Sequence, residues 1–454
     1  MAKSKSDGWR ERDRKVLWHP FTQQQAWEEE SFPVIESGDG VHLVDVDGTR
    51  YLDGVSSLWC NVHGHKKKQI DQAIQKQLEK IAHATFLGLS HPPAIELAEK
   101  LVDIAPKGLT RVFFSDNGST AVEVALKMAF QYWQQLGRHQ KVKFITCAGG
   151  YHGDTLGAVG VGGLDLFHST FKQLLFQTIR FPNTYAYRCE RTSVLEECGE
   201  HVIEEVEGIL KTHGHEVAAL IIEPIMQGAG GMILQPPGFL TSLRTLCDKY
   251  NVLLIADEVM IGFGRTGKMF ACDHEKVTPD LMALSKGLSG GYLPLAATLA
   301  TGKIYDAFLG DISEQKAFFH GHTFTANPLS CAAALASLKA MERDKVLEKM
   351  NPKVHWFGNA LQEFYKIRQV GDIRMIGMAA GIELVQDGAT KEPFPPEMRM
   401  GHRVAEEARA RGAIIRPLGD VVVLMPPLAI SMNDFKRLVR IVQESIEVAV
   451  SSVN

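Results

Sequence analysis

Short apolar runs that alternate with amphipathic helical stretches constrain this chain more than any other feature of its sequence. Helical periodicity marks "QIDQAIQKQLEKIA", "AIELAEKLVDIA" and "TAVEVALKMAFQYWQQL", and short apolar runs stand at "RVFF", "VKFIT", "VAALIIE" and "NVLLIA". Strands that are buried on both faces and separated by helices are typical of a mostly parallel, doubly wound sheet. We therefore predict an α/β fold, and we expect ligands beyond the carboxyl ends of its strands.

The length of the chain indicates more than one domain. Its 454 residues exceed the size at which a single core usually keeps growing. After the stretch "FTANPLSCAAALASLKAMERD", the pattern restarts with mixed helices and strands, among them "VVVLMPPLAI". We predict an N-terminal segment over residues 1–65, a large domain over 66–335 and a C-terminal small domain over 336–454.

Charge and composition argue against several classes of protein. The formal net charge of -4 lacks the basic excess of nucleic-acid-binding proteins. No apolar stretch approaches the roughly 20 residues that a membrane-spanning helix needs, and the start "MAKSKSDGWRERDRKVLWHP" has no apolar signal segment. The 7 cysteines are scattered and never spaced C-x-x-C, which is typical of reduced thiols. These features predict a cytoplasmic protein with no nucleic-acid or membrane partner.

Glycine-rich sequences follow two of the predicted strands. The segment Asp116–Thr120 leads from "RVFFS" into a helix, where free N–H groups could bind an anion or the polar residues could simply cap the helix. Tyr151 and His152 stand in "CAGGYHGDTLGA", directly after "VKFIT". An aromatic ring there could stack on a flat ligand or pack in the core.

Acidic residues follow two further strands. Glu223 comes after "AALII", and Asp257 and Glu258 come after "VLLIA". Half-buried carboxylates are costly without a cation or a donor nearby. Asp257 has no cationic neighbour in the sequence, so we expect its partner to come from elsewhere, and a protonated ring nitrogen of a bound ligand would serve.

A single lysine separates an apolar run from a glycine-rich turn. Lys286 stands in "LMALSKGLSGGYLPLAATLA" with no acid beside it. Burying a lysine costs several kcal/mol unless its charge is neutralised or put to use. We therefore expect Lys286 to have a chemical function.

Two short motifs suggest other functions, but both lack their usual context. "GFGRTG", at positions 262–267, matches G-x-G-x-x-G, yet the sequence after it shows no amphipathic helix of the kind that dinucleotide binding requires. The pairs His63-x-His65 and His320-x-His322 lack the cysteine or carboxylate companions of a zinc site. We predict no metal site and keep an NAD-dependent oxidoreductase as a remote alternative.

Taken together, Lys286, Asp257, the Gly118-Ser119 helix start and Tyr151-His152-Gly153 resemble the class III, fold-type-I aminotransferases that use pyridoxal phosphate. The motifs "EPIMQGAGGM", "DEVMIGFGRTG" and "SKGLSGGYLPLAAT" are typical of this family, and the resemblance covers most of the chain. It implies a smaller domain made from the N- and C-terminal segments. "WHPFTQ", "DGVSSLWCNVHGH" and "FFHGHTFTANPLSCAAA" resemble, more narrowly, a branch in biotin synthesis that aminates the ketone of 8-amino-7-oxononanoate.

The resemblance also implies the residues that bind pyridoxal phosphate. Lys286 would form a Schiff base with the cofactor aldehyde and move the substrate proton. Asp257 would keep the pyridine nitrogen protonated, and Glu223 would assist Asp257 indirectly. Further contacts would come from Tyr151 stacked on the pyridine ring, from Gly118 and Ser119 at the phosphate, and from Thr323 of the partner subunit in a homodimer with shared active sites. Lys286, Asp257 and Tyr151 are the expected catalytic residues.

Substrate contacts are implied in the same way. Arg416, in "IIRPLGD", matches the arginine that holds the acceptor carboxylate, a task that suits a bidentate guanidinium. Considered alone, Arg416 would more often be a surface residue near a turn, and Tyr151 a core residue. The other expected pocket residues are Phe21, Trp59, Asp154, Arg265 and Gly321.

The amino donor is left open by a departure from the family pattern. Enzymes of this branch that use S-adenosylmethionine carry "SSWW" and "HPYT", whereas this chain has Leu58-Trp59 and Phe21. Losing one indole and one phenol removes a stacking face and a hydrogen bond. We therefore expect either S-adenosylmethionine or lysine as donor. The alternatives are another class III ω-aminotransferase acting on a diamine or a β-amino acid, and a cofactor-binding protein without catalysis.

Overall fold

The computed structural model describes residues 4–451, and a seven-stranded sheet lies at its centre. Its strand order is β4-β12-β11-β10-β7-β5-β6, and β12 alone runs antiparallel to both of its neighbours. The predicted α/β class with a mostly parallel sheet is confirmed. The strands are β4 (Leu109–Ser115), β5 (Lys143–Cys147), β6 (Thr178–Phe181), β7 (Val217–Ile222), β10 (Leu253–Asp257), β11 (Leu281–Leu284) and β12 (Ala296–Thr301).

Both faces of this sheet are buried, because successive strand residues join two different hydrophobic clusters. Ile221 and Ile255 pack in a cluster with helix α6 (Gly118–Gln135), whereas Leu220 and Leu254 belong to the cluster on the opposite face. This explains why the strands are apolar runs without polar alternation. Among the helices that contribute to this opposite cluster are α5 (Pro92–Ile104), α9 (Leu195–His213), α10 (Phe239–Lys249) and α12 (Pro328–Arg343).

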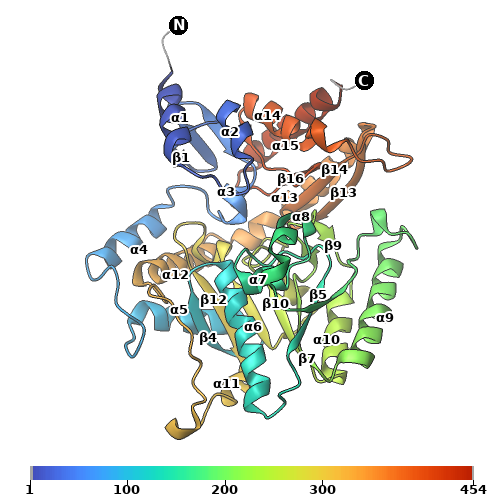
Figure 1. The fold of residues 1–454 in the computed structure, drawn as a ribbon. Coiled ribbons are helices and arrows are strands. Elements are labelled where there is room, and N and C mark those ends of the chain that lie inside the picture. The colour runs from blue at the N-terminus through green and yellow to red at the C-terminus, as the bar shows by residue number, and fades with distance from the viewer. Residues whose placement is uncertain (1–3, 452–454) are drawn as a thin grey trace.

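Both ends of the chain contribute to a smaller body above the sheet (Figure 1). One four-stranded sheet has the order β1-β2-β3-β15, in which β15 pairs with β3 in parallel. The implied association of the N- and C-terminal segments is therefore present. The domain boundaries at 65 and 335 stay predictions, and the second falls inside α12. The strands here are β1 (Ile35–Asp39), β2 (His42–Asp45), β3 (Arg50–Asp53) and β15 (Ala413–Ile414).

The remaining elements complete this body and the connections between the layers. A three-stranded sheet contains β13 (Val370–Ile376), β14 (Ala379–Leu384) and β16 (Val421–Leu424), and a short pair contains β8 (Met226–Gln227) and β9 (Ile233–Leu234). The other α-helices are α1 (Lys5–Val16), α2 (Gln24–Glu29), α3 (Ser56–Trp59), α4 (Lys68–Leu78), α7 (Leu156–Gly160), α8 (Asp165–His168), α11 (Gly302–Asp306), α13 (Val346–Gln362), α14 (Met400–Ala410) and α15 (Met432–Ser451). The 3₁₀ turns are η1 (Ser169–Leu174), η2 (Ala186–Arg188), η3 (Ala271–His274), η4 (Lys286–Ser289), η5 (Ile312–Glu314), η6 (Glu363–Lys366) and η7 (Pro396–Met398).

The glycine-rich segment 262–267 does not open a helix. It forms turns, and the next regular element is the 3₁₀ turn η3, whose N–H groups at Ala271 and Cys272 donate to Glu258. A dinucleotide fingerprint needs a helix at this point. Within residues 4–451, no helix is long and apolar enough to cross a membrane, and all seven cysteines are free thiols.

Candidate active site

A cavity of about 760 Å³ opens at the carboxyl ends of the parallel strands. It brings together residues from five strand ends, as expected for a sheet of this type. The cavity is lined by Asn117, Gly118 and Ser119 after β4, by residues 151–155 after β5, by Glu223 after β7, by Asp257 of β10 and by Lys286 after β11.

Asp257 is held in place by two donors. Its Oδ2 lies 2.7 Å from Nδ1 of His152, and its Oδ1 accepts a hydrogen bond from the Val259 N–H at 3.0 Å. Burial opposes a positive charge on His152, yet the hydrogen bond and the negative charge of Asp257 raise the pKa of His152 above its usual value. The pair can therefore carry opposite charges inside the protein.

Lys286 begins η4 with a left-handed backbone, at φ 46°. Its Nζ lies 4.9 Å from the centre of the Trp59 ring. Burial lowers the pKa of Lys286, against the opposing charges of Asp257 and Glu223. A lysine with a lowered pKa supplies more neutral amine, which is the nucleophilic form.

Helix α6 begins at the cavity wall. The Asn117 side chain caps this helix by accepting from the Thr120 N–H. The N–H groups of Gly118 and Ser119, at the first two helical positions, have no intrahelical acceptor. A Cβ at Gly118 would come within 2.5 Å of Val259, and a Cβ at Gly153, whose φ is +120°, would collide with Ser119. Two glycines thus let three loops converge where an anion can bind.

A chain of hydrogen bonds orients the Ser119 hydroxyl. Thr155 donates its hydroxyl proton to Glu123 Oε1 at 2.5 Å, and the same oxygen accepts from the N–H groups of Gly157 and Ala158. Ser119 Oγ lies 2.7 Å from Thr155 Oγ1 and accepts from the Thr155 N–H at 3.0 Å. Since the Thr155 proton points to Glu123, Ser119 is the donor in the hydroxyl pair.

Glu223 fixes the loop that carries Tyr151. Its Oε1 accepts from the Tyr151 N–H at 3.1 Å, and its Oε2 accepts from the Gly228 N–H at 2.9 Å. Burial raises the pKa of Glu223 to about 7. The Tyr151 hydroxyl donates to Asp154 Oδ2 at 2.6 Å, and burial followed by this contact raises the pKa of Tyr151.

Apolar side chains form the outer wall of the cavity. Phe21 meets Phe167 edge to face, with ring centres 5.2 Å apart, and Trp59 covers Lys286. Arg416 is the cationic side chain on this side, and it is exposed. The outer wall thus combines an apolar surface with the Arg416 guanidinium, a group that can bind a carboxylate.

Three predicted residues lie outside the lining of the cavity. Arg265 is 3% exposed and donates to the carbonyls of Met378 and Pro426. Gly321 and Thr323 are exposed on a loop whose His322 lies 2.9 Å from Asp116, at the cavity rim. Every other predicted site residue lines the cavity.

Sequence reasoning missed two roles that the structure makes visible. His152 was grouped with Tyr151, but its contact with Asp257 spans 105 positions and has no local signal. Glu123 was not singled out, although a glutamate on the apolar start of a helix was a possible signal. Within residues 4–451, no group of three or more His, Cys, Asp or Glu side chains could hold a metal ion.

Comparisons with known proteins identify the family of the chain. Residues 23–446 match the family described as Aminotransferase class-III. The chain is 53% identical over 438 residues to an adenosylmethionine-8-amino-7-oxononanoate aminotransferase of Geobacter sulfurreducens, a match that covers 96% of this chain and 97% of the relative. It is 35% identical to an omega-aminotransferase of Caulobacter vibrioides, covering 95% of this chain and 97% of that protein.

Solved structures give the same result. The crystal structure of adenosylmethionine-8-amino-7-oxononanoate aminotransferase from Methanocaldococcus jannaschii superposes with a TM-score of 0.92 at 43% identity, covering 97% of this chain and 99% of that one. The omega transaminase from Pseudomonas jessenii in complex with PMP superposes with a TM-score of 0.94 at 32% identity, covering 98% of each chain. With a family match over almost its whole length, the chain belongs to the class-III aminotransferases.

Proposed function

We propose that this enzyme is a pyridoxal-phosphate-dependent aminotransferase that converts 8-amino-7-oxononanoate to 7,8-diaminononanoate in biotin biosynthesis. The observation that carries the proposal is the position of Asp257 and Lys286 at the ends of the adjacent parallel strands β10 and β11, facing one cavity. An acid and an amine at neighbouring strand ends can bind opposite sides of one pyridine ring, the acid at the ring nitrogen and the amine at the aldehyde.

The residues of the cavity fit this cofactor. The free N–H groups at the start of α6 suit its phosphate, and Gly118 and Gly153 leave room for a close approach. Asp257 is a buried carboxylate that suits a protonated pyridine nitrogen, and Lys286 offers an amine for the aldehyde. Tyr151 lines the same cavity and offers a face for stacking.

When bound, the cofactor supplies an electron sink for a broken C–H bond. The chain supplies the rest of the chemistry. Lys286 Nζ would accept the α-proton of the amine donor and deliver it to C4′ of the cofactor, a transfer that its lowered pKa favours. Asp257, supported by His152, holds a proton on the ring nitrogen, while Glu223 fixes the Tyr151 loop through backbone N–H groups.

Arg416 and the apolar wall support a keto acid as acceptor. A guanidinium at the mouth can bind a terminal carboxylate, and Phe21, Trp59 and Phe167 can enclose an alkyl chain. Relatives named for 8-amino-7-oxononanoate, at 53% and 51% identity, support this acceptor over others. The ω-aminotransferase alternative is supported by the 35% identical relative from Caulobacter vibrioides.

The names of the same relatives favour S-adenosylmethionine as donor. Leu58 and Phe21, which line the cavity where the family pattern has Trp and Tyr, keep lysine as the second candidate.

Seven free cysteines support a reducing compartment, the cytoplasm.

We further propose a homodimer in which Thr323 of the partner subunit completes the phosphate site. The Thr323 loop packs on the chain near residue 83, since the rings of His83 and Phe324 lie 4.8 Å apart and His91 Nε2 lies 2.8 Å from the Ala326 carbonyl. Large apolar side chains are exposed on these two segments, and a second copy would bury them. They are Leu87, Leu89, Phe319 and Phe324.

Sedimentation tests the dimer. The variant Leu87→Glu/Phe319→Glu should shift the enzyme to monomers and weaken cofactor binding, because the phosphate site loses the partner residue. Val448→Glu, at an exposed apolar position on α15, is the control. A fully active wild-type monomer would contradict the proposal.

Turnover tests the reaction itself. Purified enzyme supplied with pyridoxal phosphate, 8-amino-7-oxononanoate and an amine donor should form 7,8-diaminononanoate, detected by mass spectrometry. Turnover of pyruvate or 2-oxoglutarate without any turnover of that ketone would establish the ω-aminotransferase alternative.

A further inference from the structure

The four residues of the short element α3 (Ser56–Trp59), whose last two line the cavity, adopt left-handed backbone conformations. The φ angles of Ser56, Ser57, Leu58 and Trp59 are 52°, 49°, 74° and 70°. L-residues disfavour this region, since Cβ crowds the following carbonyl, and they visit it mostly as single residues. A left-handed turn of this length therefore persists only where its surroundings hold it.

Asp53, at the end of β3, is one of the residues that hold this turn. Its carboxylate accepts from both the Ser57 N–H at 2.8 Å and the Ser57 hydroxyl at 2.7 Å. His65 Nε2 lies 3.3 Å from the same carboxylate, whose side chain is fully buried. Asp53 thus binds the second residue of the turn at two points.

Ser56 is fixed from the opposite side of the turn. Its hydroxyl donates to the Met425 carbonyl at 2.6 Å and accepts from Arg265 Nη2 at 3.2 Å. Arg265 is itself held by the Met378 and Pro426 carbonyls. These contacts connect the turn to the C-terminal segment and to the loop after β10.

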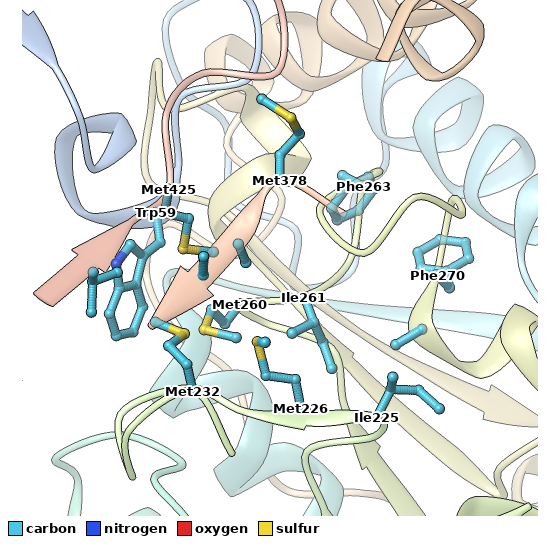
Figure 2. Close-up of a cluster of buried hydrophobic side chains, with 14 of the residues drawn as sticks. Trp59, Ile225, Met226, Met232, Met260, Ile261, Phe263, Phe270, Met378 and Met425 are labelled. Atoms are coloured by element: carbon cyan, nitrogen blue, oxygen red, sulfur yellow. The ribbon is translucent and has the colours of Figure 1, made fainter. Parts of the chain in front are cut away.

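The turn presents its last two residues to the cavity. Leu58 is 50% exposed at the wall, and Trp59 is 7% exposed with its ring over Lys286 Nζ. Figure 2 shows the Trp59 indole at the edge of a buried cluster that includes Met232, Met260 and Met425. Its Nε1 is buried without a hydrogen-bond partner among the described residues.

We propose that Asp53 and Arg265 are positioning residues for substrate recognition: they hold residues 56–59 in the left-handed turn and so fix Leu58 and Trp59 as the substrate-side wall of the cavity. This inference rests on the proposed function for the identity of the substrates. It assigns Arg265 a role through Ser56 instead of a contact with substrate. The proposed cofactor contacts at the start of α6 and at the end of β10 lie on other elements of the chain.

The experiment compares Asp53→Asn with Asp45→Asn in the loaded enzyme. Asp45 is a matched control because it is a buried carboxylate in the same four-stranded sheet, and it accepts from the Tyr51 hydroxyl at 2.9 Å. Asp53→Asn should lower kcat/KM for the ketone about tenfold or more, since misplaced wall residues misplace the substrate. Its Kd for pyridoxal phosphate, from absorbance titration, should match that of the control.

A second substitution, at Ser57, distinguishes a positioning role of Asp53 from a general contribution to protein stability. In the Asp53→Asn background, Ser57→Gly should restore most of the lost kcat/KM, because glycine adopts positive φ freely, whereas Ser57→Ala should not. Equal kcat/KM for Asp53→Asn and Asp45→Asn, or equal rescue by alanine and glycine, would overturn the positioning role. A wild-type enzyme that does not aminate the ketone would instead overturn the proposed function.

Discussion

Nδ1 of His152 lies 2.7 Å from Oδ2 of Asp257, and both side chains are buried. The sequence predicts that Asp257 meets a cation or donor that is distant in the sequence, and His152 is one such partner. Because a carboxylate only accepts hydrogen bonds, Nδ1 of His152 carries the proton. His152 thereby orients the Asp257 carboxylate in the cavity.

Two substitutions of His152 test this support. His152→Asn can keep an N–H donor near the position of Nδ1, whereas His152→Leu cannot. We expect the leucine variant to lose activity by about tenfold or more and the asparagine variant to lose less, as is usual for hydrogen bonds to charged groups. Steady-state rates with saturating cofactor measure the difference, and equal losses in the two variants would argue against the hydrogen bond.

Lys286→Ala should abolish transamination while the cofactor still binds, because the anion site at α6 is a separate element. Borohydride treatment followed by mass spectrometry should attach cofactor to the wild type and not to the variant. Lys353→Met is a suitable control, since Lys353 is also buried but donates to the Leu428 and Ile430 carbonyls outside the cavity. Turnover near the wild-type rate in Lys286→Ala would show that another group carries the proton.

Asp257→Asn should leave the fold intact and slow the reaction by roughly a hundredfold or more, since it deletes a preorganised charge. The amide oxygen can still accept from the Val259 N–H, and the amide NH2 can donate to Nδ1 of His152 once that ring carries its proton on Nε2. Single-turnover rates and circular dichroism check the two halves of this prediction. An unchanged rate would refute a role for the Asp257 charge.

Glu223 should make stability depend on pH. Its pKa is raised from 4.5 to about 7 by burial, so between those values the folded state keeps a proton that the unfolded state has released. The contribution of Glu223 to the free energy of unfolding therefore falls as pH rises through this window, by on the order of 3 kcal/mol at most. Urea denaturation of the wild type and Glu223→Gln at several pH values measures it, and parallel pH profiles would contradict the prediction.

The identity of the amino donor should respond to two wall residues. The double variant Leu58→Trp/Phe21→Tyr restores an aromatic face and a phenol in the cavity lining, and we expect it to gain rate with S-adenosylmethionine relative to lysine. The measurement is the conversion of the bound cofactor to its amine form by each donor alone, followed by absorbance. No change in the ratio of the two rates would mean that donor choice lies elsewhere in the cavity.

The sequence by itself determined the sheet and the main chemical positions. Apolar runs separated by amphipathic helices are typical of a parallel sheet whose two faces are both buried, as in a doubly wound fold. The carboxyl ends of parallel strands meet at one edge, so the sequence predicts Asp257 and Lys286 at the same edge, and the pairing of β10 with β11 makes them neighbours. The sequence can predict these positions because each strand is visible as a local apolar run, and because ligands of such sheets bind beyond the carboxyl ends of the strands.

Only the tertiary structure decided what surrounds these positions. Ser56 bonds to Met425 across 369 positions, and His152 meets Asp257 across 105. The left-handed turn at 56–59 opposes the local preference of its own residues and exists because Asp53 and Arg265 hold it. Such contacts depend on how distant segments pack, so no periodicity in the sequence encodes them, and the burial of Arg265 outside the cavity has the same origin.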